Sequence, residues 1–181
     1  MRYFCLVFSL LFLLTSCGEI PPDRLAYQEK RLTVTADFTV NGETVSSTLT
    51  LEPPAYDEDG RMLARDALFV IGENSIISGV TFEIAGGKLY VSSGVLRIPL
   101  EDETSVGGIC DILSLFCISP ESFHHAEATE LDGKACEAAY YADGANTVTV
   151  LLDRQTTLPM RIDAVIDGRE LSAVIREITA E

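Results

Sequence analysis

The chain has 181 residues, 47% of them hydrophobic, and its formal net charge is −15 at pH 7. Such an acidic surface repels phosphate groups, which argues against nucleic acid as a partner. The length corresponds to one domain that buries a core without needing disulfides.

The first 17 residues have the pattern of an export signal. A positive charge, Arg2, precedes an apolar run over residues 4–13, and Leu-Thr-Ser-Cys follows at 14–17. This arrangement looks like a bacterial lipoprotein signal peptide (residues 1–16) with its lipobox. The resemblance implies a diacylglyceryl group on Cys17 and anchoring at the extracytoplasmic face of the cell membrane. An ordinary signal peptide cut near Ser16 is the alternative.

The mature chain is expected to consist of a tether and one domain. Residues 17–29 hold the lipidated cysteine and a polar, proline-containing segment without an apolar period, which is typical of a linker. Residues 30–181 are expected to form a single domain.

The domain begins with a predicted hairpin. Apolar residues alternate with Thr and Asp over 31–41, as in a half-buried strand. Asn41-Gly42 predicts a tight turn, because both central residues need positive φ. The returning strand, with alternating apolar residues from Val45 to Leu51, ends at Pro53.

More strands are predicted on both sides of one helix. Residues 67–71 fit either a strand or a buried helical turn, whereas 80–84 and 89–100 alternate around a Gly-Gly turn. Strand-like segments resume over 123–178 and are separated by turns at 131–134, 143–146 and 167–168. The chain therefore predicts about eight to ten strands in meander order.

The helix is predicted over 105–118, where apolar residues cover most of the helical circumference. Pro120 ends it, and Asp111 and Ser114 share one face. These two side chains are expected to face solvent at the open side of a groove, and contact with a ligand headgroup is the alternative.

No catalytic or metal-binding constellation is predicted, and we expect neither an enzyme nor a cofactor. His124 and His125 are adjacent on a strand, so their side chains are expected to point to opposite faces, and no third zinc ligand is suitably spaced. Cys110 near a helix start, with His124 as its base, is an alternative, but its apolar neighbours favour a packing role.

The three cysteines of the domain raise the question of a disulfide. Cys110 and Cys117 are seven residues apart, about 10.5 Å along a helix, which exceeds the reach of a disulfide. Our hypothesis is a bridge from Cys136 to one of them, if the helix packs on its strand.

The segment Asp-Arg-Gln-Thr-Thr-Leu-Pro-Met-Arg-Ile at 153–162 follows a Thr/Val strand. This turn resembles the penultimate hairpin of the LolA/LppX/RseB-like lipoprotein carriers and sensors. The hairpin at 32–51 and the turn at 131–134 resemble that group as well. The resemblance spans residues 30–178 and implies an unclosed half-barrel with helix in its concavity, where members bind acyl chains or relay envelope signals. This sequence has fewer evident helices than the family, so a smaller lid is expected.

The expected fold class is α+β, a strongly curved antiparallel half-barrel wrapped around one apolar helix. A one-sided antiparallel sheet must cover its apolar face, and any concavity left over is the default ligand site. We expect a lipoprotein that binds lipid or acyl chains; the alternative is an envelope interaction or sensor module with a filled groove. The predicted groove residues are Phe38, Leu49, Phe82, Ile84, Ile112, Leu113, Phe116 and Val150.

Overall fold

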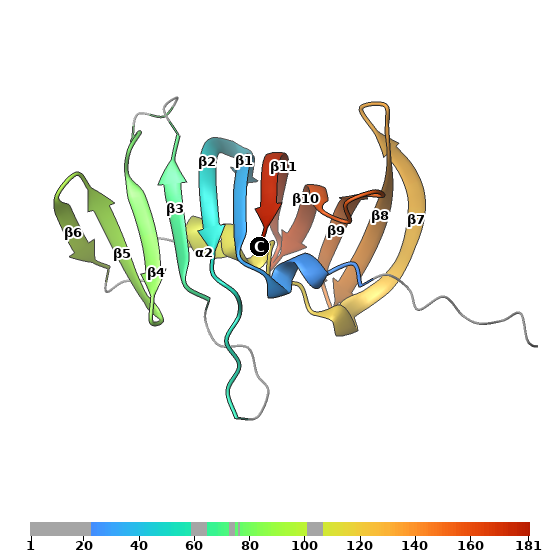
Figure 1. Cartoon of the computed structure of the whole chain (residues 1–181), viewed down its shortest axis with the longest axis horizontal. Coiled ribbons are helices and arrows are strands. Elements are labelled where there is room, and N and C mark those ends of the chain that lie inside the picture. Colours follow the sequence, from blue (N-terminus) through green and yellow to red (C-terminus); the bar gives the residue numbers. More distant parts are fainter. Residues whose placement is uncertain (1–22, 59–64, 73–74, 76, 101–106) are drawn as a thin grey trace, which may run out of the picture.

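A computed structural model of the chain describes residues 23–58, 65–72, 75, 77–100 and 107–181. The predicted signal peptide and Cys17 lie outside these residues. Within them, an 11-stranded antiparallel sheet curves without closing, and one α-helix lies against it (Figure 1). The α+β class and the open, curved sheet expected from the sequence are therefore confirmed.

The strands are β1 (Leu32–Val40), β2 (Glu43–Leu51), β3 (Ala67–Ile71), β4 (Thr81–Ala85), β5 (Lys88–Ser93), β6 (Leu96–Pro99), β7 (Phe123–Leu131), β8 (Lys134–Asp143), β9 (Asn146–Asp153), β10 (Pro159–Ile166) and β11 (Arg169–Ala180). Their order in the sheet is β6-β5-β4-β3-β2-β1-β11-β10-β9-β8-β7. Two meanders thus meet at the β1–β11 pair. The ambiguous run at 67–71 is the strand β3.

The topology explains where the helix lies. Because β6 and β7 form opposite edges of the sheet, the chain between them must cross one face. That connection carries α2 (Gly107–Ser114) and the short 3₁₀ helix η3 (Pro120–Ser122). In Figure 1, α2 runs behind the central strands, and its contacts are with β1 and β11. The helix is shorter than predicted, because residues after Ser114 continue as a turn.

Tight turns set the register of the hairpins. Asn41 and Gly42 have φ values of 50° and 85°, as the Asn-Gly pair predicts. Asp167 and Gly168, at 51° and 74°, make the corresponding turn between β10 and β11. Both pairs allow the strands to twist together without splaying.

The core lies on the face that α2 covers. Phe38 of β1 is fully buried, and its ring lies 5.5 Å from that of Phe69 on β3 and 6.4 Å from that of Phe116, just after α2. The three rings join the sheet to the crossing connection, with the first pair tilted and the second edge-on.

The opposite face of the central strands is polar. Thr35 and Thr39 of β1 share hydroxyl hydrogen bonds with Thr48 (3.3 Å) and Thr44 (2.9 Å) of β2. Asp37 accepts hydrogen bonds from the Ser46 hydroxyl and from the Arg176 guanidinium of β11 (2.6 Å). These pairs lie across neighbouring strands, the geometry that stabilises an antiparallel sheet.

Asp37→Asn should make stability less dependent on pH. The Ser46 hydroxyl and Arg176 lower the pKa of the Asp37 carboxyl, so the folded state favours the carboxylate. This contribution is present above the unfolded-state pKa of about 3.9 and is lost as pH falls through the lower folded-state pKa. We expect the free energy of unfolding of the wild type to exceed that of the variant by less than about 1 kcal/mol at pH 7, and this difference to vanish at acid pH. Urea unfolding at several pH values measures the difference, and the exposed Asp143→Asn serves as control. A difference that grows on acidification would contradict the assignment.

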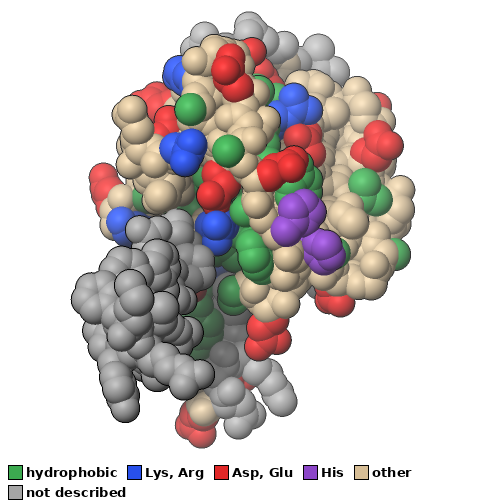
Figure 2. Space-filling model, turned by 90° about the vertical axis from the view of Figure 1, so that its right-hand side faces the viewer, with side chains coloured by type: hydrophobic (Ala, Val, Ile, Leu, Met, Phe, Trp, Pro, Cys, Tyr) green, Lys and Arg blue, Asp and Glu red, His purple; other side chains and the backbone are tan. Residues whose placement is uncertain are grey.

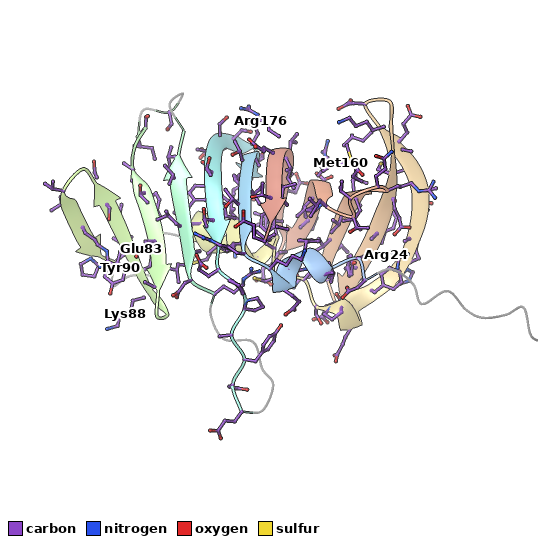
Figure 3. All side chains as sticks on the ribbon, in the orientation of Figure 1. Arg24, Glu83, Lys88, Tyr90, Met160 and Arg176 are labelled. Carbon is purple, nitrogen blue, oxygen red and sulfur yellow. The ribbon has the colours of Figure 1, made fainter. Side chains whose placement is uncertain are left out.

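The segment before β1 packs on the domain. Leu25 and Tyr27, in and beside the 3₁₀ helix η1 (Ala26–Glu29), are buried in the core. Arg24, labelled in Figure 3, pairs with Glu137 of β8 and lies 5.1 Å from the ring centre of Phe123 on β7. The sequence places residues 23–29 in the tether; in the structure Leu25 and Tyr27 of this segment belong to the hydrophobic core.

The hypothesis of a disulfide to Cys136 is wrong. Among the described residues, no disulfide joins Cys110, Cys117 and Cys136. Cys136 of β8 lies opposite Thr129 of β7 and Asp153 of β9 in the sheet. It is not part of the main core cluster and lies on the face away from α2. Burial raises the pKa of the Cys117 and Cys136 thiols, which makes them poor nucleophiles.

Candidate functional site

An open groove of about 940 Å³ lies between α2 and strands β2 to β4. Its volume is in the range of small-molecule sites, about 300–1,000 Å³. Apolar side chains make most of its wall: Val40, Val45, Phe69, Ile71, Ile77, Phe82, Ile109 and Ile112. Polar residues at the hairpin and loops complete it: Asn41, Glu43, Thr44, Ser46 and Ser75, with Gly108 of α2.

The groove exists because the helix is too short to cover the whole face. Eight residues make about 12 Å of helix, and they lie over the sheet centre at β1 and β11. On the β8 side, η1 packs its buried Tyr27 against the core. On the other side, Phe82 and Ile84 of β4 stay only partly buried. The described residues therefore leave part of the inner face open on that side of the helix.

An ion pair positions α2 over the sheet. The Asp111 carboxylate accepts a hydrogen bond of 2.6 Å from the Arg169 guanidinium at the start of β11. The Asp111 side chain is 11% exposed, so the prediction that it faces solvent is wrong. Arg169 is 58 residues from Asp111 in sequence, and nothing in the local sequence of either residue predicts their contact.

The far end of the crossing connection is held by a buried arginine. Arg65 donates hydrogen bonds to the backbone carbonyls of Glu52 (2.8 Å), Lys30 (3.0 Å) and Phe116 (3.4 Å). Nearby, Gln28 accepts a hydrogen bond of 2.9 Å from the Ile118 amide. These bonds link η1, the end of β2 and the turn after α2, so the face is closed at this end.

The structure divides the eight predicted groove residues into three groups. Phe82 and Ile112 line the groove. Ile84 and Leu113 are partly buried against the core beside it. The remaining four are fully buried and form the core itself: Phe38, Leu49, Phe116 and Val150.

Sequence reasoning missed several groove residues. Val40 and Val45 flank the Asn-Gly turn and continue the apolar alternation of β1 and β2 to the end of the hairpin. That alternation was sufficient to place them on the inner face. Ile71, the last residue of β3, and Ile109, on α2, became groove residues through the position of the helix, which the local sequence does not encode.

His124 and His125 lie side by side, and the prediction that they point to opposite faces is wrong. The β7–β8 register shifts between Phe123 and His125, which interrupts the strand alternation. Their Nδ1 atoms are 2.7 Å apart, and Figure 2 shows the two exposed rings together on one surface.

Two further features of the described residues bear on function. They contain no group of three or more His, Cys, Asp or Glu side chains arranged to hold a metal ion. None of their helices has the length and apolar character needed to span a bilayer.

No family model and no curated protein matches the chain. Solved structures are similar in fold. A putative outer membrane lipoprotein-sorting protein domain from Vibrio parahaemolyticus has 10% identity and a TM-score of 0.40, over 90% of this chain and 91% of that one. LprF from Mycobacterium bovis has 12% identity and a TM-score of 0.46, over 86% and 88%.

MucB from the Pseudomonas aeruginosa MucA/MucB complex is also similar, with 15% identity and a TM-score of 0.44. The match covers 87% of this chain and 55% of MucB, so this chain spans about half the length of that protein. These similarities to MucB, LprF and the lipoprotein-sorting domain concern the fold.

Proposed function

We propose that this protein is a membrane-anchored extracytoplasmic lipoprotein that binds lipid or acyl chains in the groove between α2 and β2 to β4, with no catalytic role. The observation that carries the proposal is the groove itself, about 940 Å³ with mainly apolar walls. Exposed apolar concavities of this kind mark binding sites for apolar ligands.

The distribution of polar residues favours an amphiphilic ligand. Val45, Phe69 and Phe82 offer an apolar wall for a hydrocarbon chain. Asn41 and Glu43, beside the hairpin turn, are exposed at the rim. Among the described residues that line the groove, Glu43 alone carries a charge. Its carboxylate disfavours an anionic headgroup. The ligand class that fits best has an apolar chain and an uncharged or cationic head.

Filling the groove tests the proposal. Ile109→Trp adds an indole to the groove wall and should weaken binding of a fluorescent fatty amine or monoacylglycerol at least about tenfold, equivalent to about 1.4 kcal/mol. Val174→Trp adds the same ring to the outer face, where Val174 is 43% exposed, and should leave binding unchanged. Fluorescence titration gives the affinities, and native mass spectrometry of the full chain identifies lipid that co-purifies. Absence of co-purified lipid together with equal affinities in both variants would refute ligand binding in this groove.

The membrane anchor has a separate test. Cys17→Ser removes the thiol that the lipobox resemblance assigns to the diacylglyceryl group. We expect the variant to leave the membrane fraction or to accumulate unprocessed. Mature protein that still fractionates with membranes would contradict anchoring at Cys17, whatever the groove binds.

An interaction or sensor module is the second candidate, because the centre of the face is filled. Phe38, Leu115 and Phe116 are fully buried there and leave no space for a ligand. In that role, Ile109→Trp would change neither lipid content nor lipid affinity. A protein partner would then be expected to engage the exposed parts of the domain.

A further inference from the structure

We propose that His124 and His125 form a surface site for a divalent copper ion, with the two Nδ1 atoms as its protein ligands. The site lies on the edge strand β7 and involves no residue of the groove. Both rings are exposed, so solvent water can occupy the other coordination positions.

The ligand set favours copper over zinc. The two Nδ1 atoms lie 2.7 Å apart, so both are within reach of one ion at a bond length of about 2.0 Å. Zinc sites usually have three or four protein ligands, whereas this surface offers two. Cu²⁺ prefers tetragonal geometry and also stands highest among the divalent first-row ions in affinity for such ligands.

The bulge at the start of β7 produces this arrangement. It offsets the β7–β8 register between Phe123 and His125, so that consecutive side chains come together on one surface. In the metal-free pair, one Nδ1–H donates to the other Nδ1. On binding, that proton moves to Nε2 of the same ring, the hydrogen bond between the rings breaks, and both Nδ1 lone pairs coordinate the ion.

Neighbouring groups hold His125 in place and favour a cation. The ring stacks on Tyr140 of β8, with centroids 4.4 Å apart and planes at 14°. The Tyr140 hydroxyl donates a hydrogen bond of 2.8 Å to Glu127, two residues beyond His125 on β7. The carboxylate and the net charge of −15 make this surface attractive to cations.

Copper titration of the full chain tests the site cleanly, because the sequence contains 2 histidines in all. We expect calorimetry to show one Cu²⁺ bound per chain, and electron paramagnetic resonance to show coupling to two imidazole nitrogens. His124→Asn and His125→Asn should each weaken binding at least about tenfold, since each leaves one imidazole. The exposed positions allow both variants to fold, which circular dichroism checks.

Two controls separate this site from other copper ligands. Cys110→Ser removes an exposed thiol and should leave Cu²⁺ affinity unchanged. Zn²⁺ should bind more weakly than Cu²⁺ to the wild type. Unchanged Cu²⁺ affinity in both histidine variants, a spectrum without imidazole coupling, or Zn²⁺ binding as tight as Cu²⁺ would each overturn the proposal.

Discussion

Replacing Phe38 by alanine is expected to lower the free energy of unfolding by about 3–5 kcal/mol. The Phe38 ring is fully buried and contacts both Phe69 and Phe116, so its removal leaves a cavity where β1, β3 and the connection after α2 meet. The surrounding elements cannot all move inward to fill it, because β1 is hydrogen-bonded on both sides. Denaturant unfolding followed by circular dichroism measures the change.

The matched control for Phe38→Ala is Val174→Ala on β11. Val174 faces the outer surface and is 43% exposed, so its truncation should cost less than about 0.5 kcal/mol. Equal losses for the two variants would mean that the aromatic cluster is not the centre of the core.

Replacing Arg65 by methionine is expected to lower the free energy of unfolding by about 3 kcal/mol. Methionine fills much of the same space, but the carbonyls of Glu52, Lys30 and Phe116 lose their donor. The hydrogen bond to the Phe116 carbonyl is buried, so that carbonyl loses its donor at a cost, and the three bonds together tie separate segments of the chain. Denaturant unfolding at pH 7 measures the loss.

Two controls separate the Arg65 network from loss of charge alone. Arg65→Lys keeps the charge but offers one nitrogen instead of a planar fork, so it should recover part of the stability. Arg176→Met removes an arginine that is 56% exposed and should cost less than about 1 kcal/mol. A loss for Arg65→Met no larger than that for Arg176→Met would show that the buried hydrogen bonds contribute little.

Sheet, turns and inner face followed from the sequence because they depend on local periodicity. Alternation along β1 and β2 identifies the buried side, and Asn41-Gly42 determines how the two strands pair. The length of α2 did not follow. The apolar pattern continues past Ser114, but the chain there turns to place Phe116 against Phe38, and tertiary packing overrides helical propensity.

The groove was predictable only in part. Alternation assigned both Phe38 and Phe82 to the inner face, but which of them α2 covers depends on contacts distant in sequence. The pairing of Asp111 with Arg169, which positions the helix, joins residues from different halves of the chain. Strand periodicity failed at His124 and His125 because a bulge has no distinctive sequence.

The packing of η1 limits how far the domain extends from the bilayer. Arg24 and Leu25 fix the chain to the body of the domain, so six peptide units separate Cys17 from the described residue Asp23. Six residues span at most about 20 Å when fully extended. If Cys17 is lipidated as proposed, the domain stays at the membrane surface, within reach of lipids in its own leaflet. Exchange of an acyl chain would then require its donor or acceptor to approach this membrane, because the short linker keeps the domain at the membrane surface.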